Sequence, residues 1–85
     1  MNKTMATAEA ILQRLDIIFQ DVLDDEAIRL SPATTAADID GWDSLNHVRL
    51  MVSVEREFKV KFTALELSYL KNVGDLVALL QSRGA

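Results

Sequence analysis

The five residues Gly41-Trp42-Asp43-Ser44-Leu45 decide the fold, because they join two segments of different character. Residues 24–43 lack a regular hydrophobic pattern and predict a loop, whereas residues 44–58 predict a helix uninterrupted by Gly or Pro. Ser44 therefore lies beside unpaired backbone N–H groups and the positive end of a helix dipole, an environment that favours a phosphate ester. We interpret Ser44, preceded by Asp43, as an attachment point. The alternative is a simple helix N-cap, worth about 1 kcal/mol.

The flanking segments predict an all-α fold. Upstream, apolar residues at helical spacing predict a helix over residues 7–23, followed by an ordered loop that contains one helical turn. Downstream, residues 60–62 alternate like a strand but have nothing to pair with, so we expect an extended connector. Thr63 is expected to cap a short third helix that holds Leu70, and Asn72 to cap a last helix that ends near residues 83–84. The prediction is a small four-helix bundle with a long loop between its first two helices.

Residues 7–83 are expected to form one domain, with residues 1–6 as a flexible tail. Trp42 is expected to anchor the loop together with Ile28, Leu30 and Ile39, and His47 to lie at the edge of the core. The predicted core consists of Ile11, Leu15, Ile18, Phe19, Leu50, Val54, Phe58, Phe62, Leu70, Val77 and Leu80.

Composition narrows the class of function. The chain has 85 residues, a formal charge of −4 and no cysteine, which excludes disulfides and thiolate metal sites and argues against nucleic acid as a partner. The longest uncharged apolar stretch, residues 76–80, is too short to span a bilayer. We therefore expect a cytoplasmic monomer that uses neither a membrane nor a metal ion.

Two chemical interpretations of the central stretch fail on spacing. A calcium loop with Gly41 at its sixth position requires acidic residues at positions 36 and 47, where the chain has Ala36 and His47. A hydrolase would need Asp43, Ser44 and His47 to form a triad, but on consecutive turns of one helix the carboxylate cannot lie behind the far nitrogen of the imidazole. No catalytic residue is therefore predicted.

The third interpretation is a resemblance. The stretch from Gly41 to Leu45, with residues 55–58 (Glu-Arg-Glu-Phe) and residues 72–76 (Asn-Val-Gly-Asp-Leu), resembles the acyl carrier protein family over residues 11–80. That resemblance implies a 4′-phosphopantetheine group esterified to Ser44, installed from coenzyme A by a phosphopantetheinyl transferase with magnesium, while Asp43 orients this chemistry. The thiol of the arm would carry acyl or aminoacyl groups as thioesters between biosynthetic enzymes, and the carrier itself would catalyse nothing. The alternative is an unmodified helical interaction module.

The second predicted helix departs from the acidic pattern of the fatty acid carriers, because it carries Arg49 and Arg56, with Glu55 and Glu57 as its only acids. We therefore expect a specialised carrier, whose cargo could be an acyl chain, an amino acid or an extender unit.

That helix also has more apolar residues than one face can bury. At 100° per residue, the stripe of Leu50, Met51, Val54 and Phe58 is assigned to the core. The opposite stripe is predicted to be a partner-binding surface, made of Leu45, Val48 and Val52 with Arg49 and Arg56 at its rim. A small apolar cleft near the second and third helices is expected to shelter a loaded chain.

Overall fold

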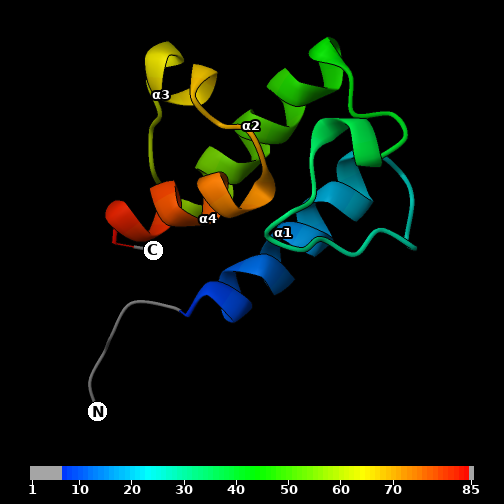
Figure 1. Cartoon of the computed structure of the whole chain (residues 1–85), viewed down its shortest axis with the longest axis horizontal. Coiled ribbons are helices and arrows are strands. Elements are labelled where there is room, and N and C mark those ends of the chain that lie inside the picture. The colour runs from blue at the N-terminus through cyan, green and yellow to red at the C-terminus, as the bar shows by residue number, and fades with distance from the viewer. Residues whose placement is uncertain (1–6, 85) are drawn as a thin grey trace.

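A computed structural model describes residues 7–84, and within this range every regular element is helical. The elements are α1 (Ala8–Val22), the 3₁₀ turn η1 (Ala36–Asp38), α2 (Ser44–Phe58), α3 (Ala64–Ser68) and α4 (Val73–Ser82). In Figure 1, α1 lies beneath both α2 and α4, and α3 sits at one end of the bundle. The all-α prediction is confirmed, as is the single helical turn within the long loop. The tail predicted over residues 1–6 lies outside the described residues.

Polar side chains fix the helix starts. The Thr7 hydroxyl accepts a hydrogen bond from the Ala10 N–H at 3.1 Å, and the Asn72 side chain accepts one from the Asp75 N–H at 2.8 Å. Thr63 and Glu66 form a reciprocal capping box at the start of α3. The third helix is shorter than predicted and does not include Leu70. Its last turn tightens, because the Leu70 N–H bonds the Leu67 carbonyl three residues back.

The core forms where α1 packs on α2 and α4. Nine of the eleven predicted core residues are buried, but Phe62 and Leu70 are only half-buried. These two side chains lie on the segments that connect α2 to α3 and α3 to α4, and they pack against the core from outside the helices. The buried set also includes Ile28, Leu30, Met51, Val73 and Leu76.

The long loop is held by hydrogen bonds at both of its sides. Asp16 on α1 accepts a bond from the Leu30 N–H at 2.7 Å. On the other side, the N–H groups of Val73 and Gly74 donate to the Thr34 and Pro32 carbonyls, each at 2.9 Å. The first turn of α4 therefore has its free donors satisfied by the loop backbone. This arrangement explains how a loop that is long for so small a domain stays ordered.

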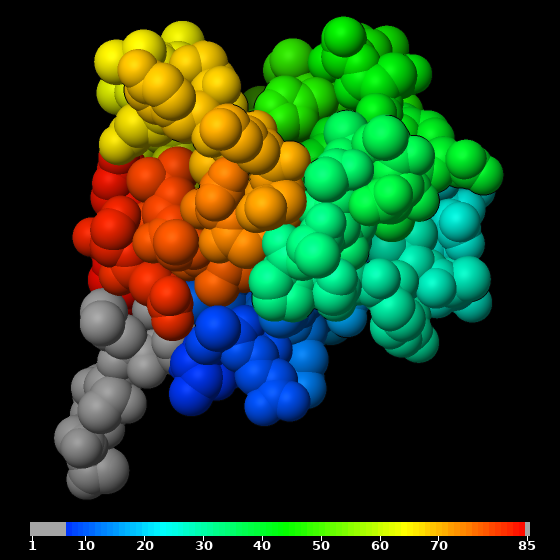
Figure 2. Space-filling view, in the orientation of Figure 1, coloured from blue at the N-terminus to red at the C-terminus, as the bar shows by residue number. Residues whose placement is uncertain are grey.

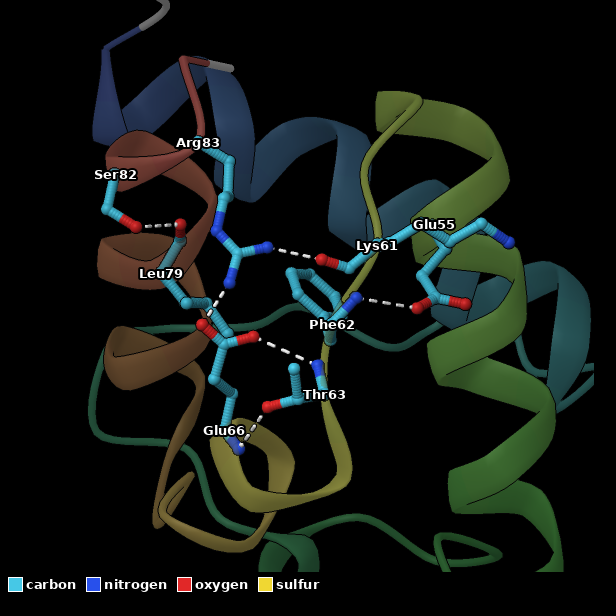
Figure 3. A network of polar contacts seen from close by, with 8 residues as sticks. All are labelled: Glu55, Lys61, Phe62, Thr63, Glu66, Leu79, Ser82 and Arg83. Atoms are coloured by element: carbon cyan, nitrogen blue, oxygen red, sulfur yellow. Dashed lines mark hydrogen bonds and ion pairs between the residues drawn. The ribbon is translucent and has the colours of Figure 1, made fainter.

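The extended connector between α2 and α3 is fixed by side chains from its neighbours (Figure 3). α2 ends at Lys59, which adopts the left-handed conformation with φ of 57°. Glu55 then accepts a hydrogen bond from the Phe62 N–H at 2.8 Å. Arg83, at the end of α4, bonds the Lys61 carbonyl and pairs with Glu66. Residues 7–84 contain no β-strand, so the prediction of a connector rather than a paired strand is confirmed.

Candidate attachment site

The loop enters α2 through a sharp turn. Gly41 has φ of +87°, a conformation that costs glycine little, as predicted. Asp43 then caps the helix: its carboxylate accepts a hydrogen bond from the Asn46 N–H at 2.9 Å, and its carbonyl accepts one from the His47 N–H at 2.8 Å. The alternative in which Ser44 is the N-cap is therefore wrong, because Asp43 has this role and Ser44 is the first residue inside the helix.

The Ser44 hydroxyl is free as a consequence. Ser44 is exposed, and its side chain forms no hydrogen bond with any residue in the range 7–84. It faces an open recess of about 400 Å³, which is also lined by Ala36, Trp42, Asp43 and His47. The N–H groups of Ser44 and Leu45, in the first turn, likewise have no partner among the described residues. A free hydroxyl, two open donors and room above them suit a phosphodiester.

Two side-chain hydrogen bonds hold this junction in shape. The Asn46 amide donates to the Gly41 carbonyl at 2.8 Å, and the Trp42 indole N–H donates to Nδ1 of His47 at 3.0 Å. Trp42 also packs edge-on against Phe19, with ring centroids 4.9 Å apart. Trp42 is thus the predicted loop anchor, and His47 is half-buried at the edge of the core as expected. The role of Asn46 was not predicted, because nothing in the sequence pairs an amide with a carbonyl five residues earlier.

The two stripes of α2 face as the periodicity predicts. Leu50, Met51, Val54 and Phe58 are buried, whereas Leu45, Val48 and Val52 are 71%, 59% and 42% exposed. Arg49 and Arg56 are also exposed. The Arg49 guanidinium donates to the Asn46 side-chain oxygen at 3.2 Å, which brings a positive charge close to the first turn of α2. An exposed apolar strip rimmed by arginines therefore begins next to Ser44.

The apolar cleft expected near the second and third helices has a somewhat different position. A cavity of about 80 Å³ lies among α2, the loop before it and the segment that leads into α4, and no residue of α3 lines it. These segments meet in the upper part of Figure 2, where α2 is green and residues 70–73 are orange. Leu70, which follows α3, supplies the contact from that side. The lining residues are Ala36, Trp42, His47, Met51, Leu70, Lys71, Asn72, Val73 and Leu76.

Comparisons with known proteins agree with this geometry. The family described as "Phosphopantetheine attachment site" matches residues 13–80. The meromycolate extension acyl carrier protein of Mycolicibacterium smegmatis is 34% identical over 76 residues, which cover 89% of this chain and 77% of that protein. The acyl carrier protein of Thermotoga maritima is 29% identical over 79 residues, covering 93% and 98%. A solution structure of holo acyl carrier protein from Geobacter metallireducens superposes with a TM-score of 0.79 at 51% identity, covering 84% of this chain and 82% of that one.

The fold and the site thus define a phosphopantetheine-binding domain. The chain belongs to the acyl carrier protein family, and it bears acyl groups on a covalently attached 4′-phosphopantetheine. Proteins of this family are carriers that work with a phosphopantetheinyl transferase and with biosynthetic enzymes. None of the helices in residues 7–84 has the length and apolar character that crossing a membrane requires.

Proposed function

We propose that Ser44 is the residue to which phosphopantetheine is attached. The observation that carries this proposal is the hydroxyl itself: it is exposed at the first position of α2, and capping of the helix is left to Asp43. A serine that capped the helix would have its oxygen engaged by a backbone N–H, whereas this one has both its proton and its lone pairs available.

The surroundings of Ser44 assign roles to its neighbours. In the loading reaction the Ser44 oxygen loses its proton to the transferase and forms a bond to phosphorus, while coenzyme A releases 3′,5′-ADP. The N–H groups of Ser44 and Leu45 are then available to the phosphodiester oxygens at the positive end of the helix dipole. Asp43 orients the serine by fixing the first turn, and it gives the transferase's magnesium ion a nearby carboxylate. When bound, the group supplies a thiol that forms thioesters.

The chain acts through its partners and catalyses nothing itself. Partner enzymes dock on the strip of Leu45, Val48 and Val52, because an exposed apolar surface beside the attachment point suits transient binding. Arg49 and Arg56 select partners that present acidic or mixed surfaces. Tethering raises the effective concentration of the cargo at each docked enzyme. We place this work in the cytoplasm and assign it to a monomer.

The basic character of α2 further supports a specialised carrier in a dedicated pathway. Arg49 and Arg56 are both exposed on this helix, so a partner selected for a strongly acidic helix would meet repulsive charges. The cargo on such a carrier is an acyl or aminoacyl group whose identity is set by the enzyme that loads it.

Intact-mass measurement tests the attachment. The protein is incubated with coenzyme A and a broad-specificity phosphopantetheinyl transferase, and it should gain the mass of one phosphopantetheine. Ser44→Ala should gain nothing, whereas the matched control Ser82→Ala, at an exposed serine near the end of α4, should load like the unaltered protein. If Ser44→Ala still gained this mass, the attachment site would be another residue. Absence of loading in the unaltered protein would also overturn the proposal.

A further inference from the structure

An open groove of about 500 Å³ lies at the end of α2, where the chain turns into the connector. Lys59 takes the left-handed conformation with φ of 57°, and the Val60 N–H donates to the Glu55 carbonyl at 3.1 Å. The first residues of the connector therefore line the same groove as the last turns of the helix. We call this space the basic groove. Its lining residues are Val52, Glu55, Arg56, Lys59, Val60 and Lys61.

The basic groove holds positive charge on a chain whose formal charge is −4. Arg56, Lys59 and Lys61 are all exposed, and no carboxylate within residues 7–84 forms an ion pair with any of them. Arg56 and Lys59 complement the negative end of the α2 dipole, which explains cations at these two positions. Lys61 lies beyond the helix, where the effect of the dipole has fallen off. The fold thus leaves three cations of the groove without a charged partner in the described part of the chain.

The carboxylates nearest to these cations in the sequence are engaged elsewhere. Glu55 lines the groove, but it accepts a hydrogen bond from the Phe62 N–H at 2.8 Å (Figure 3). Glu57 pairs with Arg14 of α1 at 3.0 Å. Both carboxylates therefore have partners other than the cations of the groove, and a carboxylate that neutralises the groove must come from another molecule.

The basic groove also has an apolar component. Val52 is 42% exposed, and Val60 is half-buried where it packs against the core. An apolar centre with a charged rim is the usual composition of a protein-binding surface. Binding to nucleic acid or to an anionic membrane would need a larger set of cations, and the negative formal charge of the chain opposes both. The composition of the groove therefore favours a protein that carries carboxylates.

We propose that the basic groove binds an acidic segment of a partner protein, in which an aliphatic side chain lies between carboxylates. The aliphatic side chain contacts Val52 and Val60, and the carboxylates pair with Lys59 and Lys61. Because Lys59 follows the 15 residues of α2, it lies roughly 20 Å along the helix from Ser44. A partner that occupies both the groove and the apolar strip of α2 is thereby given one direction along the helix. That this partner is an enzyme served by the carrier rests on the proposed function, whereas the preference of the groove for carboxylates does not.

The preference for carboxylates is tested by NMR on the unloaded protein with the peptide acetyl-Asp-Glu-Leu-Glu-Asp-amide. The peptide should shift the amide signals of Val52 and of residues 59–61 more than those of Ser44 and Leu45. Binding should weaken as salt is added, because the charges involved are exposed. The same peptide with Asn and Gln in place of Asp and Glu should bind more weakly. Equal binding of the uncharged peptide, or shifts centred on Ser44, would overturn the proposal.

Two matched double variants separate the groove from the charge of the whole chain. Lys59→Gln with Lys61→Gln should bind the acidic peptide about fivefold more weakly, the change expected for loss of two exposed ion pairs. Arg29→Gln with Lys71→Gln removes two exposed cations that do not line the groove, so this variant should bind like the unaltered protein. Equal weakening in the two variants would overturn the proposal.

A membrane is the other class of acidic partner that the test covers. If the protein sedimented with vesicles of phosphatidylserine and phosphatidylcholine but did not bind the peptide, the groove would not be a site for a protein segment. None of these measurements requires a loaded carrier. A failure of attachment at Ser44 would therefore appear in the intact-mass experiment alone, and the peptide titration would still decide the role of the groove.

Discussion

Asp43 and Asn46 close the first turn of α2 by a hydrogen bond of 2.9 Å from the Asn46 N–H to the Asp43 carboxylate. The cap of the helix therefore precedes Ser44, the proposed attachment residue, by one position. A capping serine would combine helix capping with the proposed modification, whereas here Asp43 caps the helix and Ser44 is the proposed site of modification. Substitutions at the two positions should accordingly have different effects.

Ser44→Ala is expected to change the free energy of unfolding by no more than about 0.5 kcal/mol, because its hydroxyl has no partner to lose. Asp43→Ala should cost about 1 kcal/mol, the usual value of an N-cap, and Asp43→Asn should restore most of it because asparagine also caps. Urea denaturation of the three variants measures these differences. A loss of 1 kcal/mol in Ser44→Ala would contradict the assignment of the cap.

The partner surface is tested by a matched pair on α2. Val52 is 42% exposed and Val54 is fully buried, so Val52→Glu should leave the melting temperature nearly unchanged, whereas Val54→Glu should unfold the domain by burying an unpaired charge. Val52→Glu should also slow loading by the cognate enzyme roughly tenfold, a loss of about 1.4 kcal/mol in binding. If Val52→Glu were loaded at the original rate, Val52 would not be part of the docking surface.

The Glu66 carboxylate gives a pH-dependent prediction (Figure 3). Its hydrogen bond with Arg83, and next the backbone N–H of Thr63, lower the pKa of Glu66 from its ordinary value of 4.5. Because the folded pKa lies below the unfolded one, the stabilisation is present above about pH 4.5 and is lost as the pH falls through the folded pKa. Glu66→Gln should therefore be less stable than the unaltered protein at pH 7, and the two should converge in acid. Denaturation at a series of pH values measures this, and a constant difference would exclude the carboxylate as its source.

Gly74 tests the contact between the loop and α4. A methyl group at this position would lie 2.9 Å from the Pro32 carbonyl oxygen, which is backbone and cannot move aside easily. Alanine in a helix usually gains up to about 1 kcal/mol over glycine, but here Gly74→Ala should destabilise the fold by roughly 1–3 kcal/mol. The reverse change at an exposed site on the same helix, Ala78→Gly, gives the propensity effect alone. If Gly74→Ala instead stabilised the fold, the loop backbone at Pro32 would have moved aside to make room for the methyl group.

Much of the fold could be predicted because local signals agree with one another. The predicted bounds of α2 match the structure, since an acidic cap precedes it and no Gly or Pro interrupts it. Its buried and exposed stripes also follow the 3.6-residue period. The end of α3 was harder to predict, because five residues give too little periodicity to separate helix from a tightened turn.

The fine structure of the site was less accessible from the sequence. Asp43 and Ser44 are both good capping residues, so only the backbone angles reveal which of them caps. The bond from Trp42 to His47 depends on how a loop side chain folds back over a helix, which neither propensity nor spacing determines. Lys59 follows the last residue of α2 in a left-handed conformation. Glycine or asparagine is usual at such a position, so a lysine there gives little indication in the sequence that the helix ends.

The backbone hydrogen bonds from Val73 and Gly74 to the Thr34 and Pro32 carbonyls join the start of α4 to the long loop. α4 cannot fray from its first turn without releasing the Thr34 and Pro32 carbonyls, and the loop cannot lift away without exposing the amides of α4. Hydrogen exchange at Val73 and Gly74 thus reports the integrity of the segment that leads to Ser44. We therefore expect a substitution that loosens the first turn of α4 to speed hydrogen exchange in the loop that precedes Ser44 as well.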